Sequence, residues 1–88
     1  MNDQERKETR QNGLSSPAFR AKVAADIGAQ IAEQRTAAGM TPEQIERLTG
    51  YKATKIMAHE RGDYPPKAVT ELAAIAEAIG CTIRLVKN

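Results

Sequence analysis

The 88-residue chain has no tryptophan, one phenylalanine (Phe19), one cysteine (Cys81) and one histidine (His59). A single cysteine cannot form an internal disulfide, and one cysteine with one histidine supplies too few ligands for a conventional zinc site. A chain this short buries limited apolar surface, so without disulfide or metal the remaining source of stability is oligomerisation. We therefore expect a homodimer without a metal and without a cofactor.

Catalytic groups are also scarce. An enzyme needs a clustered acid, base, nucleophile or metal, whereas His59 and Cys81 lie in different segments and the acidic residues are scattered. The sequence has no serine elbow and no Gly-rich phosphate-binding loop. We predict that the protein is not an enzyme and has no small-molecule substrate.

Long apolar runs are missing as well. No window approaches the roughly 18 apolar residues of a membrane span, and the first residues are charged rather than apolar. We expect a cytoplasmic protein that does not contact a membrane. The net charge of +2 favours a polyanionic partner only weakly, so charge alone does not argue for nucleic acid.

Three segments follow one another along the chain. Residues 1–16 are polar with balanced charges and predict a flexible N-terminal tail, either inert or an arm that touches DNA or a partner. Residues 17–80 carry helical periodicity and predict the folded domain. Residues 81–88 change to the alternation of a strand.

The first helix is predicted from Pro17 to about residue 38. Ser16 is suited to the N-cap and Pro17 to the first helical position, while Gly39 fits the left-handed position that ends the helix. Apolar residues recur every four positions and form one stripe. They are Phe19, Val23, Ile27 and Ile31.

Two short helices follow. Thr41 begins the first as an N-cap, with Gln44 as its capping-box partner and Gly50 as its end, and Ile45 and Leu48 are expected to face the core. The second is predicted from about residue 52 to 60. A fourth helix, about 67–79, is expected to turn five residues inward before it ends at Gly80. They are Val69, Leu72, Ala73, Ala76 and Ile79.

The last segment has the pattern of a β-strand. Cys81, Ile83 and Leu85 alternate with polar residues, and one strand cannot satisfy its backbone groups within this chain. Pairing with the same strand of a second subunit would satisfy them, so these residues are candidates for a dimer interface. The alternative is a frayed tail. The expected fold class is thus all-α, with four to five helices and a short C-terminal strand paired across the dimer.

Two short helices joined through a glycine are typical of a helix-turn-helix. With the residues around them, the chain resembles the phage-repressor-like (Cro/C1, Xre) helix-turn-helix family over about residues 25–80. The matching residues are Ile27, Gly28, Ile31, Arg35, Gly39, Met40, Thr41, Glu43, Ile45, Leu48, Gly50, Thr54, Ile56, Glu60 and Gly62, with the Ala-Glu-Ala-Ile-Gly run at 76–80.

The resemblance implies roles for several residues. In the family the second short helix lies in the major groove, and Arg35 and Glu60 stand at positions that commonly form an ion pair. Lysine, threonine and alanine can contact base edges, although a solvated charged face is the alternative. The implied base-reading residues are Lys52, Ala53, Thr54, Lys55 and Met57.

Phosphate contacts are less well defined. Many members have glutamine where this chain has Pro42, which offers a phosphate neither a side-chain donor nor an amide, and the neighbouring Glu43 would repel the DNA backbone. Packing is an equal alternative for Tyr64. The phosphate candidates are Thr41, Tyr51, Arg61, Tyr64 and Lys67.

The resemblance implies a dimeric transcriptional regulator that binds double-stranded DNA at an inverted-repeat operator, most simply an autorepressor. One alternative is the antitoxin of a toxin–antitoxin pair, which also binds a protein toxin. The other is a helix-turn-helix reused as a protein-interaction module.

Overall fold

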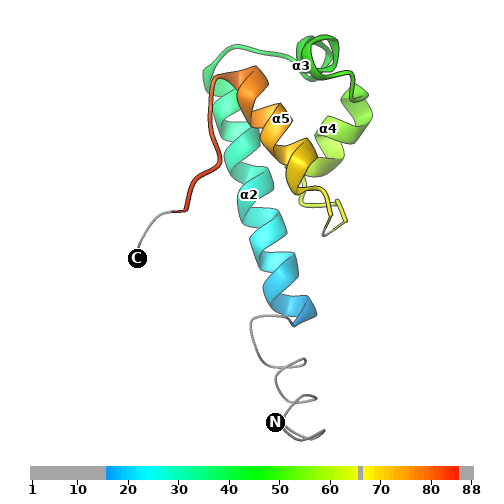
Figure 1. Ribbon diagram of the computed structural model, residues 1–88, viewed down its shortest axis with the longest axis vertical. Coiled ribbons are helices and arrows are strands. Elements are labelled where there is room, and N and C mark those ends of the chain that lie inside the picture. Colours follow the sequence, from blue (N-terminus) through cyan, green and yellow to red (C-terminus); the bar gives the residue numbers. More distant parts are fainter. Residues whose placement is uncertain (1–15, 66, 86–88) are drawn as a thin grey trace, which may run out of the picture.

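The computed structural model describes residues 16–65 and 67–85. These residues form four α-helices and no strand: α2 (Pro17–Ala37), α3 (Pro42–Thr49), α4 (Ala53–Glu60) and α5 (Val69–Ile79). The three shorter helices gather around the C-terminal half of α2, whose N-terminal half extends away from them (Figure 1). The all-helical class is confirmed for these residues, whereas the predicted tail at 1–16 lies outside them except for Ser16.

Local hydrogen bonds begin the first two helices where the sequence predicts them. The Ser16 hydroxyl accepts the backbone N–H of Phe19 at 3.1 Å, which caps α2. In α3 the Thr41 hydroxyl accepts from the Gln44 backbone at 3.2 Å, and the Gln44 side chain accepts from the Thr41 backbone at 2.7 Å. Both donors would otherwise lack a partner at a helix start, so the capping box stabilises the entry to α3.

The core joins all four helices. Its buried residues come from α2, α3 and α4, one each, and from α5, which contributes two. They are Ile31, Ile45, Ile56, Leu72 and Ile75. Ile75 is fully buried although the sequence pattern did not include it in the inward face of its helix.

Three residues expected in the core are exposed. Leu48 is 64% exposed and Val69 is 62% exposed, and Ala73 also faces solvent. Each residue of an α-helix is rotated by about 100° from the next. In α5 the inward stripe starts from buried Ala68 and continues through Leu72, so Val69 and Ala73 lie on the adjacent ridge. The predicted inward face was therefore wrong by one residue at these positions.

Within the single chain, the described residues of the C-terminal segment form no strand. Residues 81–85 have no regular secondary structure and run back beside α2 (Figure 1). A strand requires a neighbouring strand for its backbone hydrogen bonds, and the described part of this single chain offers none. Leu85 is fully exposed and Ile83 is 44% exposed, so the segment presents apolar side chains to solvent.

Among residues 16–65 and 67–85, no helix is both long enough and apolar enough to cross a membrane.

Candidate nucleic-acid interface

Helices α3 and α4 form the helix-turn-helix. Residues 50–52 connect them, and Gly50 has the left-handed backbone (φ +83°) that ends α3 and redirects the chain. Ile45 on α3 and Ile56 on α4 are both fully buried, so each helix is anchored by an isoleucine in the common core. This anchoring holds α4 against the body along one face and leaves its opposite face in solvent.

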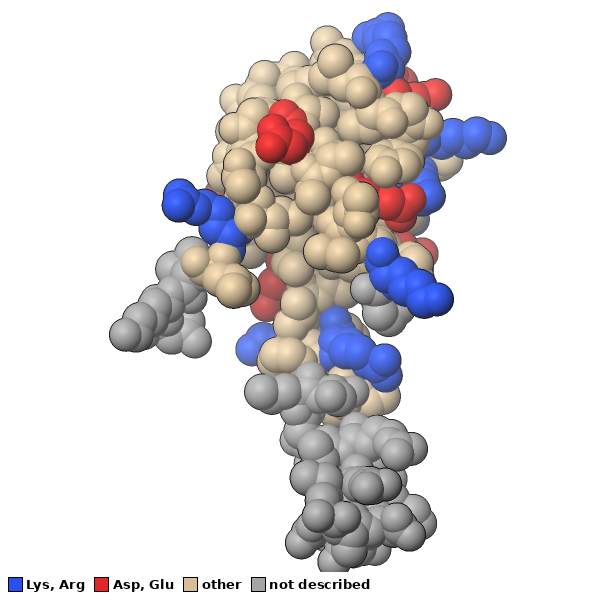
Figure 2. Space-filling view, viewed as in Figure 1, with Lys and Arg blue, Asp and Glu red and all other residues tan. Residues whose placement is uncertain are grey.

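The outward face of α4 carries exposed side chains. Thr54, Met57 and Arg61 follow one another at intervals of three and four residues, which places them on the same side of the helix. All three are exposed, and Met57 keeps 44% of its surface in solvent. Lys52, directly before the helix, is exposed as well. Figure 2 shows lysine and arginine side chains projecting along the edge of the molecule where α3 and α4 lie.

The start of α4 is capped from the neighbouring helix. Lys52 occupies the N-cap position and makes no side-chain capping bond. Instead the Glu46 carboxylate of α3 accepts the backbone N–H of Ala53 at 2.8 Å. A carboxylate at a helix N-terminus is favourable because it faces the positive end of the helix dipole.

Lys55 is turned away from the outward face. Its ammonium group pairs with the Glu71 carboxylate of α5 and lies 5.3 Å from the centre of the Tyr51 ring. The Lys55 side chain remains 48% exposed, whereas Glu71 is 22% exposed. The hydrogen bond from Lys55 lowers the pKa of Glu71 below its ordinary value, against an opposing effect of desolvation. Among the implied base-reading residues, Lys55 is thus already engaged within the protein.

Tyr64 serves the packing of the domain. Its hydroxyl donates to the Ala24 carbonyl of α2 at 3.0 Å, and its ring stacks on His59 with the ring centres 5.1 Å apart. Burial raises the pKa of Tyr64 above the usual tyrosine value, because the charged phenolate loses hydration. The single hydroxyl proton is committed to Ala24, so the structure favours packing over the phosphate contact that the sequence left open.

The other phosphate candidates are distributed around the motif. Thr41 is exposed at the start of α3, and Arg61 and Lys67 are exposed at the end of α4 and just before α5. Tyr51 is half-buried against the core, with Lys55 above its ring. Of these four candidates, only Arg61 shares the outward face of α4 with Thr54 and Met57.

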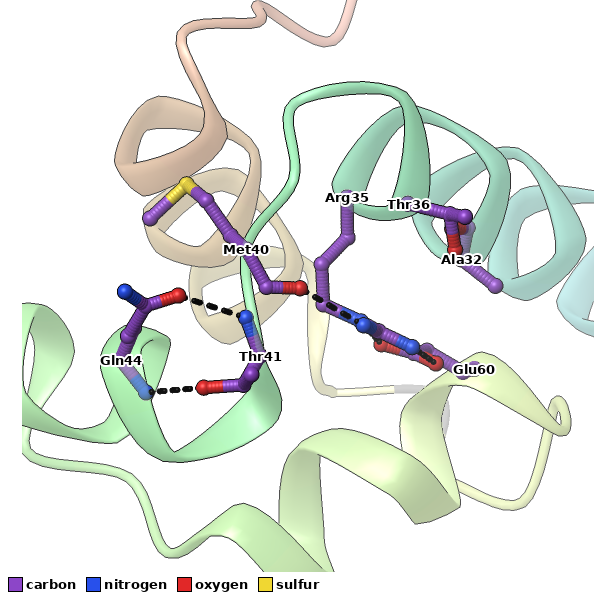
Figure 3. Close-up of polar contacts among 7 residues, drawn as sticks. All are labelled: Ala32, Arg35, Thr36, Met40, Thr41, Gln44 and Glu60. Carbon is purple, nitrogen blue, oxygen red and sulfur yellow. Dashed lines mark hydrogen bonds and ion pairs between the residues drawn. The ribbon is translucent and has the colours of Figure 1, made fainter.

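Arg35 connects three parts of the motif. Its guanidinium donates to both carboxylate oxygens of Glu60, at 2.6 and 3.0 Å, and a third N–H donates to the Met40 carbonyl at 2.8 Å (Figure 3). The Arg35 and Glu60 side chains are only 18% and 10% exposed. The hydrogen bond that Arg35 donates to Glu60 is the main cause of a raised pKa at Arg35, with burial opposing it. The pair ties the end of α2 to the end of α4 and to the loop before α3.

Two residues of this region were absent from the sequence-based set of candidates. Glu46 could have been found, because α4 lacks a capping side chain at Lys52 and its first amide needs an acceptor nearby. Glu71 gives no such signal, since its contact with Lys55 depends on how α5 packs against α4. Among the described residues, no group of three His, Cys, Asp or Glu side chains is arranged to hold a metal ion.

Comparison with known proteins identifies the class. The helix-turn-helix domain family matches residues 26–87, so the chain belongs to this family. The match agrees with the resemblance to Cro- and Xre-like proteins and defines a DNA-binding domain of the regulatory type, a class that is typically not enzymatic. No curated protein and no solved structure matches the chain.

Proposed function

We propose that the protein is a sequence-specific DNA-binding regulator that inserts α4 into the major groove. The observation that carries this proposal is the exposed outward face of α4, formed by Thr54, Met57 and Arg61, on a helix whose inner face is anchored by Ile56. The family match supports the same function. An α-helix fits the major groove, where each base pair presents a distinct set of donors and acceptors.

Each exposed group has a chemistry suited to DNA. Lys52 and Arg61 can donate to guanine O6 and N7 or to phosphate, and the Thr54 hydroxyl can contact a base edge or a phosphate. The apolar ends of Ala53 and Met57 suit thymine methyl groups. At the flanks, Thr41, Tyr51 and Lys67 remain our candidates for phosphate contacts. Lys55 joins the interface only when it leaves Glu71.

The regulator is proposed to act as a homodimer on an inverted repeat. Two copies related by a two-fold axis would place their α4 helices in successive major grooves, roughly 34 Å apart. Cys81, Ile83 and Leu85 in the C-terminal segment are proposed to pair across that axis as a strand, which would cover apolar groups that are exposed in one chain. A dimer bound at its own promoter would block polymerase and repress its gene.

Fluorescence anisotropy with DNA from the gene's own upstream region tests the proposal. A scrambled duplex serves as the reference, and both are titrated at two salt concentrations because phosphate contacts make affinity depend on salt. We expect tight, salt-dependent binding to the upstream DNA alone. Equal and weak binding to both duplexes would contradict a sequence-specific operator in that region.

Substitution of Arg61 connects binding to the outward face of α4. Arg61→Ala should weaken specific binding by about 1–3 kcal/mol if the guanidinium reads a base, and should weaken binding to all sequences alike if it contacts phosphate. Lys22→Ala is the matched control, because it removes an exposed positive charge from α2, away from the helix-turn-helix. Equal effects of the two substitutions would argue that α4 does not meet the DNA.

A second candidate function is the antitoxin of a toxin–antitoxin pair. The observation in its favour is an apolar cavity of about 470 Å³ between the N-terminal half of α2 and the start of α5. Phe19 and Val69 line it and are 40% and 62% exposed, which suits a protein partner. Co-expression with the neighbouring genes tests this: a stable complex that Phe19→Ser and Val69→Ser disrupt would support it, and purification of this chain alone would count against it.

A further inference from the structure

Glu71 on α5 lies between two side chains of α4. One oxygen of its carboxylate pairs with the Lys55 ammonium, and the other lies 3.4 Å from Nε2 of His59. Lys55 is half exposed, whereas His59 is 2% exposed. One acidic group therefore faces an exposed lysine of the helix-turn-helix and a buried histidine at the same time.

The contacts of His59 define where its hydrogen lies. Nδ1 is 2.6 Å from the Lys55 carbonyl oxygen, and a carbonyl only accepts, so Nδ1 carries a hydrogen. In the neutral ring Nε2 then bears a lone pair, and this lone pair faces a carboxylate. Nε2 is buried and has no hydrogen-bond partner among the described residues. A second proton on Nε2 would convert the unfavourable contact with Glu71 into an ion pair.

We propose that Glu71 competes with DNA for Lys55, and that protonation of His59 weakens this competition. The inference rests on the proposed DNA-binding function and deepens it, because it assigns a positioning role to a residue outside the helix-turn-helix. While Glu71 holds Lys55 against α5, the ammonium points away from the outward face of α4. Once released, the same flexible side chain can reach a phosphate or a base edge beside Thr54.

The direction of the pH effect follows from the charges around His59. On its own helix the neighbouring charged group is Lys55, from α5 it is Glu71, and from the loop after α4 the ring of Tyr64 stacks on it. An imidazolium attracts Glu71 and repels Lys55, so both effects loosen the Lys55–Glu71 pair. The affinity for DNA should therefore rise when His59 gains its second proton.

Glu71→Gln is the direct test, measured by fluorescence anisotropy on the full chain. Glutamine keeps the shape and can donate to Nε2 of His59, but it cannot hold an ammonium as a carboxylate does. Freeing Lys55 can gain no more than the pair itself contributes, so the expected increase in affinity is about 2- to 5-fold. If Lys55 reaches phosphate, the salt dependence should also steepen by about one.

Glu77→Gln is the matched control, since it removes the same charge from an exposed position of the same helix. The relevant quantity is the increase in DNA affinity of Glu71→Gln beyond that of Glu77→Gln. Lys55→Met should abolish that excess when combined with Glu71→Gln, because no ammonium is left to release. Equal affinities for the two glutamate variants, or a gain that survives Lys55→Met, would overturn the inference.

The pH profile provides a second readout that a merely structural role of Glu71 would not alter. As the pH is lowered, the affinity of the unsubstituted protein should rise more than that of Glu71→Gln, in which nothing competes for Lys55. Parallel profiles would overturn the link to His59. Binding of the upstream duplex by the unsubstituted protein distinguishes failure of this inference from failure of the proposed function. If the protein binds, the variants test only the competition between Glu71 and DNA for Lys55. If it binds no duplex, the proposed DNA-binding function is wrong.

A measurement without DNA keeps the inference testable if Glu71→Gln proves unstable. In an NMR titration of the unsubstituted protein, the Lys55 ε-methylene and ammonium signals should move together with the His59 ring signals as His59 gains its second proton. Lys55 signals that do not shift when His59 is protonated would rule out the proposed coupling between His59 and Lys55.

Discussion

At the scale of single residues, the ion pair of Arg35 should contribute more to the stability of the motif than an exposed ion pair would. Its three hydrogen bonds reach Glu60 on α4 and the Met40 carbonyl in the loop before α3. Both partners of the ion pair are largely withdrawn from water, so loss of one leaves a charge that is poorly hydrated and unpaired. Exposed pairs contribute only about 0–1 kcal/mol because water and salt screen them.

Arg35→Ala should therefore lower the free energy of unfolding by about 2–3 kcal/mol, a value below that of a fully buried pair because some exposure remains. The measurement is the midpoint of urea unfolding followed by circular dichroism. Arg47→Ala, on the exposed surface of α3, is the control and should change stability by less than about 0.5 kcal/mol. Similar losses for the two variants would mean that the Arg35–Glu60 pair does not anchor the motif.

Tyr64 links the loop after α4 to α2 through one hydroxyl. Tyr64→Phe removes the hydrogen bond to Ala24 and should cost about 0.5–1.5 kcal/mol. Because burial raises the pKa of Tyr64 in the folded state, its neutral form contributes stability below the ordinary tyrosine pKa, and this contribution is lost as the pH rises through the raised value. Thermal melts between about pH 8 and 11 should show a steeper alkaline loss for the unsubstituted protein than for Tyr64→Phe.

At the scale of elements, α2 and α4 approach each other through a glycine. A Cβ atom at Gly28 would lie 2.4 Å from the His59 carbonyl oxygen and 2.7 Å from that of Glu60. These are backbone atoms at the end of α4 and cannot rotate away. The contact explains why a residue of low helix propensity stands inside the longest helix.

Gly28→Ala gives a prediction whose sign is informative. Helix propensity alone would stabilise the protein by about 1 kcal/mol, whereas the steric clash should destabilise it by about 1–3 kcal/mol. We expect net destabilisation, with a lower melting temperature and weaker DNA binding, because α4 must move away from α2. Ala29→Gly, at the exposed neighbouring position, measures the propensity effect separately. A stabilised Gly28→Ala protein would show that the two helices have room to adjust.

At the scale of the whole molecule, the C-terminal segment is the part whose apolar side chains the single chain leaves exposed. Residues 81–85, with α2 and α5, border a cavity of about 600 Å³, lined by Ile27 and Ile31 among others. Ile83 and Leu85 lie at its edge with much of their surface in solvent. A second copy that supplied its own C-terminal segment would cover these side chains and give each strand a partner.

Leu85→Lys should therefore abolish dimerisation while leaving the fold of each subunit intact, because Leu85 makes little contact within its own chain. Sedimentation equilibrium at tens of micromolar should show a dimer for the unsubstituted protein and a monomer for the variant. Leu48→Lys, at another exposed leucine on α3, should remain dimeric. An unsubstituted protein that is monomeric at this concentration would contradict the dimer.

The amino-acid sequence was sufficient to predict the four helices, with limits correct to within about two residues, and the position of the helix-turn-helix. Caps such as Ser16 and Thr41, and the turn at Gly50, act through hydrogen bonds and backbone angles that span at most a few residues, so they can be read from local sequence. The Arg35–Glu60 ion pair was also predicted, from the resemblance to the family.

Which side of each helix faces the core, and which side chains meet across helices, depends on how the helices pack together. Leu48 and Val69 point outward and Ile75 inward because the rotation of a helix about its axis is set by packing against its neighbours, and a difference of one residue is invisible in a short apolar pattern. The capture of Lys55 by Glu71 likewise depends on the distance between α4 and α5, which no local interaction encodes.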